Sequence, residues 1–243
     1  RARVAADTMM RLAIILLSAA LSFAETADIG TLFFHDEFER IESQEEKDEI
    51  GNGWDSNSKT RAKGNKQVDL RDGAMYLYIH KEANHAISVS HTMEFTNGSV
   101  GMRFRLDRPE DSLGLDFADL SCKEVHAGHL FAAWFSPKQV WLRDLKTGAM
   151  NLKMQEARSN KSLSVEQQAV LKASERIFPR TNETAVWHTL LVTVNGDEMT
   201  AFIDDVLVGS MRSPGIAHPT KKMLRLSVPK NAVADDVKFW RRE

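Results

Sequence analysis

Apolar and polar residues alternate along most of this chain, and the clearest example surrounds an Asn195-Gly196 pair. Every second residue is apolar over 190–194, and the alternation resumes over 199–203. A period of two places one set of side chains on a single face of a strand, and Asn-Gly favours a tight hairpin turn. The pattern therefore predicts two antiparallel strands with one buried face. We expect Trp187, just before the first strand, to pack inside.

The same alternation recurs between turn residues along the rest of the chain. Asp72-Gly73 and Asn97-Gly98 supply further hairpin signals. About a dozen short strands joined by such turns are typical of an all-β protein, so we predict a two-sheet antiparallel jelly-roll sandwich. The alternating segments outside the 190–203 hairpin are 32–38, 68–70, 75–79, 87–95, 100–106, 113–120, 129–135, 140–145, 150–154, 224–228 and 237–240.

One segment has helical spacing instead. Its apolar residues between 162 and 178 recur at intervals of three, four and seven, which places them on one face of a helix. Ser164 and Gln167 form a plausible capping box, and Pro179 ends the pattern. We predict one inserted α-helix over about 162–178, which covers a sheet edge or an open face, with recruitment of a partner as the alternative.

The first residues are typical of a secretion signal. Arg11 precedes an apolar run of about nine residues, which is too short to span a bilayer, and small residues at 22 and 24 suit cleavage. A buried N-terminal helix is the alternative. We therefore expect 1–24 to comprise a signal peptide with upstream residues, 25–243 to form a single domain, and the protein to be secreted or periplasmic.

Composition narrows the possible partners. The net charge of −2 gives no reason to expect binding to nucleic acid, and no later segment is apolar enough to cross a membrane. The single cysteine, Cys122, excludes an intramolecular disulfide, so stability must come from the core. The oligomeric state is left open.

Four short motifs resemble a known superfamily. They are Phe34-His35-Asp36-Glu37-Phe38, Leu70-Arg71-Asp72-Gly73-Ala74-Met75-Tyr76, Trp187-His188-Thr189-Leu190 and Ala234-Asp235-Asp236-Val237. Over about 30–243 the chain is similar to the concanavalin A-like (laminin-G-like) jelly roll, and within it to the bacterial 3-keto-disaccharide hydrolase domain family. The resemblance implies a sandwich whose concave sheet face holds carbohydrate. It also implies an enzyme acting on glycosides as one possible function.

The richest polar segment is 116–129. His126 and His129 are spaced so that a turn could aim both imidazoles at one point, together with a carboxylate from Asp116, Asp119 or Glu124. Such a set suits acid–base catalysis or a divalent metal. We select His126, His129 and Asp116 as catalytic candidates. The alternative is a polar loop with hydrogen-bonded imidazoles.

Sugar binding requires aromatic rings for the apolar faces of the sugar and planar polar groups for its hydroxyls. By the resemblance, the candidates that would line the concave groove are Trp54, Arg61, Tyr76, His91 and Arg103. An ordinary solvated sheet face is the alternative.

Calcium is a possible structural cofactor. Asp36 lies at the first strand and Asp236 at the last, strands that commonly neighbour one another in such sandwiches, and acidic oxygens suit a hard cation. Strand-end capping by these aspartates is the alternative. The Glu-x-Asp-x-x-Glu strand motif of laminarinase-like enzymes, which supports retaining hydrolysis, is not found.

These observations favour a secreted carbohydrate-binding domain that recognises an oligo- or polysaccharide on its concave face. The first alternative is a glycoside-acting enzyme with a His/carboxylate site. The second is a structural or interaction domain without a small-molecule site.

Overall fold

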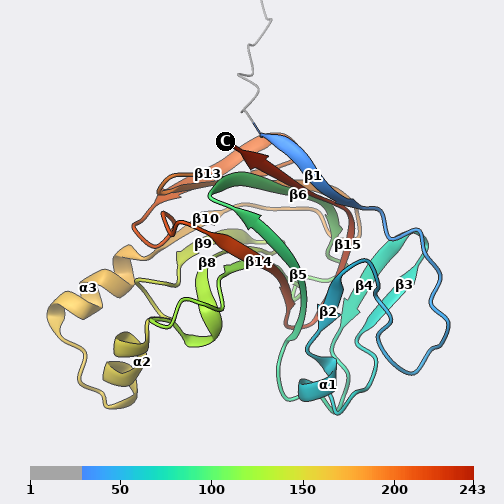
Figure 1. Ribbon diagram of the computed structural model, residues 1–243, viewed down its shortest axis with the longest axis horizontal. Coiled ribbons are helices and arrows are strands. Elements are labelled where there is room, and N and C mark those ends of the chain that lie inside the picture. The colour runs from blue at the N-terminus through green and yellow to red at the C-terminus, as the bar shows by residue number, and fades with distance from the viewer. Residues whose placement is uncertain (1–28) are drawn as a thin grey trace, which may run out of the picture.

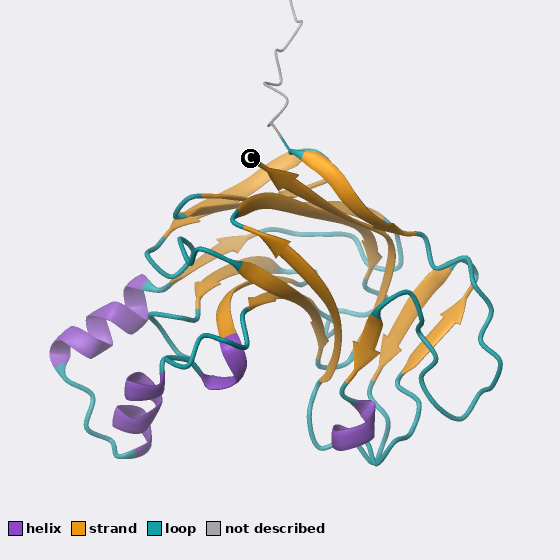
Figure 2. Ribbon diagram, viewed as in Figure 1, coloured by secondary structure: helices purple, strands orange, loops and turns teal. Residues whose placement is uncertain are grey.

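The computed structural model describes residues 29–243, so the signal peptide predicted over 1–24 lies outside the described residues. The fold is the predicted two-sheet antiparallel jelly-roll sandwich, with few helices (Figures 1 and 2). The strands of sheet A are β1 (Thr31–Asp36), β3 (Val68–Arg71), β4 (Ala74–Tyr78), β6 (Asn97–Arg105), β11 (His188–Asn195), β12 (Glu198–Ile203), β13 (Val206–Arg212) and β15 (Asn231–Arg242). Those of sheet B are β2 (Trp54–Ser56), β5 (Ile87–Phe95), β7 (Leu113–Ala118), β8 (His129–Phe135), β9 (Gln139–Asp144), β10 (Glu175–Pro179) and β14 (Lys221–Val228).

Backbone hydrogen bonds between neighbouring strands give the strand order of each sheet. Sheet A runs β13-β12-β11-β6-β15-β4-β3, and β1 also pairs with the long strand β15. Sheet B runs β10-β9-β8-β7-β14-β5-β2. The hairpin predicted around Asn195-Gly196 is β11 and β12, and Gly196 adopts the positive φ of 57° that its tight turn requires.

The core lies between the sheets and is built by the predicted alternation. On β7, Leu113, Leu115 and Phe117 point inward, where they oppose Phe135, Ala133 and Phe131 of β8, and all six are fully buried. Trp187 does not join this core. It is only half-buried, on the outer face of sheet A, where the guanidinium carbon of Arg103 lies 4.7 Å from its ring centroid.

The helices differ from the prediction in extent and number. Besides the single turn α1 (Ser58–Arg61) and a 3-10 turn (His126–Gly128), the described chain contains α2 (Leu152–Ser159) and α3 (Val165–Ala173). The predicted capping box of Ser164 and Gln167 does begin α3. The helix ends early because Ile177 and Phe178, which fit the helical spacing, pair with β9 instead as edge strand β10.

The segment over 150–154 was predicted as a strand, but most of it begins α2. Asn151 caps this helix, because its side-chain oxygen accepts hydrogen bonds from the backbone N–H groups of Lys153 and Met154. No helix within residues 29–243 is long and apolar enough to cross a membrane.

The two sheets curve in the same sense, and sheet B forms the inner side of the arch, with α1 near one end and α2 and α3 near the other (Figure 1). Because side chains alternate across a strand, the residues of sheet B that do not enter the core project into this concave side. We call this set of outward-facing residues of sheet B the binding face.

Candidate ligand-binding face of sheet B

Two tryptophans form an aromatic row across the binding face. In register, Gly114 of β7 opposes Trp134 of β8, which in turn opposes Trp141 of β9. A Cβ on Gly114 would lie 2.7–2.8 Å from atoms of the Trp134 indole, so the ring lies directly over this glycine. The missing side chain therefore allows the indole to lie flat along the sheet.

A pocket of about 280 Å³ opens beside this aromatic row. Its lining residues are Ser112, Trp134, Phe135, Ser136, Gln139, Trp141 and Arg143. The pocket therefore combines two indole rings with hydroxyl, amide and guanidinium groups, which is the mixture that a sugar requires.

A polar row lies next to the aromatic row, two residues away along each of β7, β8 and β9. The row crosses five neighbouring strands. Its register neighbours are, in order, Arg225 of β14, Asp116 of β7, Ala132 of β8, Arg143 of β9 and Glu175 of β10. Ala132 occupies the middle position with only a methyl group. Ala132 is nevertheless fully buried, so neighbouring side chains cover its methyl group.

Asp116 and His129 are in direct contact in this row. Oδ2 of Asp116 hydrogen-bonds to Nδ1 of His129, and Nη1 of Arg225 lies 3.8 Å from the same oxygen. Arg225 also approaches His129 at 3.2 Å and donates to the carbonyl of Ala127 at 2.7 Å. The other carboxylate oxygen of Asp116, Oδ1, is buried and has no hydrogen-bond partner.

His126 does not join this contact. Its ring is parallel to that of His129 at a centroid distance of 6.2 Å, and the residue is exposed. Ala127 between them has a φ of 49°, which turns the chain sharply at this point. The structure therefore brings together two of the three catalytic candidates, Asp116 and His129, and leaves His126 beside them.

Asp119, the alternative carboxylate of this segment, has other partners. It accepts hydrogen bonds from the backbone and hydroxyl of Ser121, and it contacts His218 and Lys222 at 3.3 Å each. Burial opposes ionisation of Asp119, but the hydrogen bonds from Ser121 and the contacts with His218 and Lys222 together lower its pKa to about 2. Asp119 is therefore a permanently charged anchor of the loop.

Trp54 and His91 do not reach the binding face. They oppose each other on β2 and β5 with their rings 4.9 Å apart on the core side, and Phe34 packs against both. Trp54 is buried, and its indole N–H donates to Asp36 at 2.9 Å. The structure thus corrects the expected position of both residues, because strand parity points them inward. Arg61 is exposed on α1, near one end of the arch (Figure 1).

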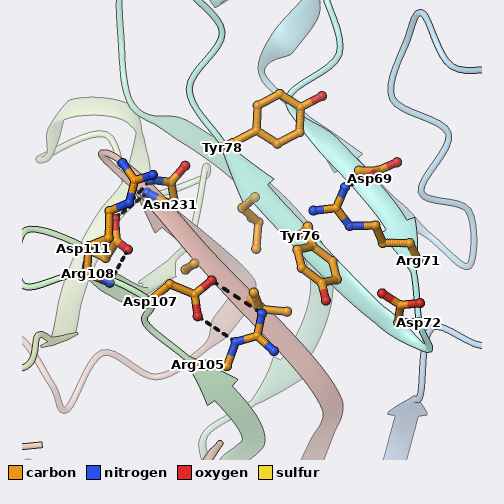
Figure 3. A pocket seen from close by; sticks show the side chains of 13 residues that line it. Asp69, Arg71, Asp72, Tyr76, Tyr78, Arg105, Asp107, Arg108, Asp111 and Asn231 are labelled. Atoms are coloured by element: carbon orange, nitrogen blue, oxygen red, sulfur yellow. Dashed lines mark hydrogen bonds and ion pairs between the residues drawn. The ribbon is translucent and has the colours of Figure 1, made fainter. Parts of the chain in front are cut away.

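Tyr76 and Arg103 lie on the outer face of sheet A, on the opposite side of the sandwich from the binding face. Tyr76 lines a trough of about 710 Å³ between β3–β4 and the loop that follows β6 (Figure 3). Guanidinium carbons of Arg71 and Arg105 approach its ring at 4.1 and 5.8 Å. Arg103 pairs with Asp235 at 3.1 Å. The proposed sugar-binding set is therefore divided between the core, one rim and the outer face.

The two calcium candidates lie on paired strands, but their side chains have separate partners. Asp36 is buried and accepts hydrogen bonds from Arg40, Asn52 and Trp54. Asp236 instead hydrogen-bonds to His35 at 2.6 Å and to Lys238 at 2.7 Å. Within the described residues, the group with potential metal-ligand atoms all within 4.8 Å is His35, Glu37 and Asp236, which excludes Asp36.

Trp134, Trp141 and Arg143 were not among the sequence candidates. Their strands were predicted: Trp141 and Arg143 alternate with the buried Val140 and Leu142 on β9, and Trp134 lies between the buried Ala133 and Phe135 on β8. Strand parity therefore contained the signal for an outward position. The sequence could not show that the outward side of this particular sheet is the concave one.

Comparisons with known proteins agree with this architecture. No family model matches the sequence, and no curated protein matches it. Among solved structures, the laminarinase from Rhodothermus marinus is similar with a TM-score of 0.59 at 12% identity, covering 87% of this chain and 97% of that one. The β-glucanase of Bacillus licheniformis gives 0.56 at 10% identity, covering 88% and 99%.

The carbohydrate-binding module CBM66 from Bacillus subtilis is also similar, with a TM-score of 0.50 at 10% identity, covering 76% of this chain and 93% of that one. At such identities the likeness shows the fold alone, which is a two-sheet antiparallel jelly roll. None of these three structures is named as a 3-keto-disaccharide hydrolase, so that part of the resemblance stays a prediction.

Proposed function

We propose that this protein binds a glycan on the concave face of sheet B. The observation that carries the proposal is the pair of adjacent rows on that face, one aromatic and one polar. Trp134 and Trp141 offer rings for the apolar faces of a sugar, while Gln139 and Arg143 of the same pocket offer an acceptor and donors for its oxygens. A secreted or periplasmic location suits such a role.

Two further observations support a ligand on this face. The helices α2 and α3 lie at one end of the arch, and neither contains a buried residue (Figure 1). The similar solved structures include a carbohydrate-binding module and two enzymes named for glucans or laminarin. A purely structural domain would be expected to fill or cover such a face, and the third function considered is therefore disfavoured.

Glycoside chemistry is the second candidate function, and the contact between Asp116 and His129 favours it. A buried carboxylate oxygen without a partner beside an imidazole is a plausible acid–base pair. The residues here that have the spacing of the laminarinase-like motif are Gly114, Asp116 and Asp119. Glycine therefore stands where that motif has its first glutamate. Because Asp119 has a pKa of about 2, it cannot serve as a general acid near neutral pH. Binding is therefore ranked above catalysis.

The test of the proposal is binding to a panel of soluble polysaccharides, measured by isothermal titration calorimetry. Trp134→Ala should weaken binding by on the order of tenfold or more, because central aromatic residues dominate such interfaces. Trp240→Ala is the matched control, since Trp240 lies over Gly101 on the outer face of sheet A.

The proposal fails if no polysaccharide binds, or if Trp134→Ala binds as tightly as the parent protein. The same samples distinguish the second candidate. Release of reducing sugar by the parent, and its loss in Asp116→Asn with binding retained, would rank catalysis first.

A further inference from the structure

Arg143 carries a charge that the protein itself leaves nearly unpaired. Within residues 29–243 its guanidinium group donates no hydrogen bond to a protein acceptor, and the carboxylate within ion-pair distance is that of Glu175, 3.8 Å from Nε. That separation is too long for a hydrogen bond. The side chain is nevertheless only 21% exposed. Burial lowers the pKa of Arg143, and the carboxylates of Glu175 and Asp116 offset this shift only in part.

Other arginines of the sandwich are better paired. Arg225, on the same face, donates to Ala127 and also contacts Asp116 and His129. On the outer face of sheet A, Arg105 donates to Asp107 at 2.7 Å. The deficit of acceptors at Arg143 is therefore local to the pocket. A largely buried guanidinium without acceptors is unfavourable, and a ligand that supplies them is stabilised there.

The orientation of Arg143 is suited to a flat anionic group. Its guanidinium carbon lies 4.0 Å from the ring centroid of Trp141, so the fork is held along the indole. It lines the same pocket as Trp134. On its other side the register neighbours are Ala132 and then Asp116. A guanidinium in a fixed plane binds carboxylate or sulfate oxygens through two parallel hydrogen bonds.

We propose that the glycan bound by this face is acidic, and that Arg143 holds a carboxylate or sulfate group of a sugar whose ring stacks on the adjacent tryptophans. This inference rests on the proposed function and specifies its ligand class. Asp116 does not prevent it, because Arg225 and His129 contact its carboxylate. The carboxylate of Glu175, whose side chain is 40% exposed, can turn outward when the ligand anion takes its place.

Two matched pairs of polymers test the charge requirement. Polygalacturonate is compared with its methyl ester, and dextran sulfate with dextran, by calorimetry at low and at physiological salt. The acidic member of at least one pair should bind the parent tighter by on the order of tenfold to a hundredfold, as expected for a charge-assisted bidentate contact. The pair that responds identifies the anion as carboxylate or sulfate.

Variants assign the effect to this site. Arg143→Met should abolish the preference for the acidic polymer, and Glu175→Gln should strengthen it by removing the competing carboxylate. Arg212→Met is the control for non-specific attraction of polyanions, because Arg212 is exposed on β13 and pairs with Asp197 and Glu198. Glu175→Gln changes only a half-exposed side chain, so it also serves if Arg143→Met folds poorly.

The outcomes distinguish failure of the acidic-ligand inference from failure of the proposed glycan-binding function. Trp134-dependent binding to neutral polymers, or to both members of each pair alike, overturns the acidic ligand and leaves the glycan function intact. A preference for acid that Arg143→Met and Arg212→Met reduce equally also overturns it, because the attraction is then non-specific. If no polysaccharide binds at all, the proposed function fails and the inference with it.

Discussion

A single buried carboxylate, Asp119, holds the loop that carries the histidines of the binding face. Its backbone N–H donates to the carbonyl of Gly128 at 2.9 Å, and its side chain accepts from Ser121. Lys222 of β14 and His218 of the loop before it contact the same carboxylate. The position of His129 therefore depends on a residue that does not contact the binding face itself.

This role predicts a specific loss of stability in acid. Because the pKa of Asp119 falls from 3.8 to about 2 on folding, its contribution is complete above pH 4 and is lost as the pH falls from 4 toward 2. Asp119→Asn should therefore lower the unfolding free energy at neutral pH by on the order of 2 kcal/mol and flatten the stability profile between pH 4 and 2.

Urea unfolding at several pH values measures this effect. Asp205→Asn, at an exposed turn between β12 and β13, is the control and should leave the profile unchanged. An Asp119→Asn profile with the same acid limb as the parent would contradict the assigned role.

At the scale of elements, the binding face depends on how neighbouring strands pair large residues with small ones. Trp134 can lie flat only because β7 presents Gly114 opposite it. The same device occurs on the other sheet, where a Cβ on Gly101 of β6 would lie 2.9 Å from the ring of Trp240. A side chain added at either glycine would therefore clash with a tryptophan, on the concave face for Gly114 and on the outer face of sheet A for Gly101.

Substituting the two glycines, Gly114 and Gly101, provides a matched test of the aromatic row. Gly114→Ala should tilt the Trp134 indole away from the sheet, weaken glycan binding by tenfold or more, and cost about 1–3 kcal/mol of stability through overpacking. Gly101→Ala should cost a similar amount of stability and leave binding unchanged. Thermal unfolding and calorimetry on both variants check this, and equal loss of binding in the two would show that the effect is only destabilisation.

The sequence predicted most strands of this fold because alternation is a local signal. It also located the contact between Asp116 and His129 within one short segment. It misassigned 175–178 to a helix, since the apolar spacing there fits both a helical face and an edge strand paired with β9. It placed Trp54 and His91 on the wrong side, because the face a strand presents depends on pairing with distant strands.

At the scale of the whole molecule, the first strand pairs with the last, and Asp36 links this strand pair to sheet B. It lies at the end of β1, which pairs with β15, and accepts from the indole of Trp54 on β2. Its carboxylate also receives both terminal nitrogens of Arg40. Although burial opposes it, hydrogen bonds from Arg40 and Asn52 lower the pKa of Asp36.

These contacts give Asp36 a structural role that does not require calcium. Asp36→Asn should lower the unfolding free energy by on the order of 3 kcal/mol, because it leaves Arg40 without its carboxylate in a buried setting. Asp236→Asn removes a more exposed pair and should cost less than about 1 kcal/mol. Because cationic and amide side chains already occupy the Asp36 oxygens, and His35 and Lys238 bind the Asp236 carboxylate, neither EDTA nor millimolar CaCl2 should shift the melting temperature. A melting temperature that EDTA lowers and calcium restores would instead establish a structural calcium site, with His35, Glu37 and Asp236 as the ligands to mutate first.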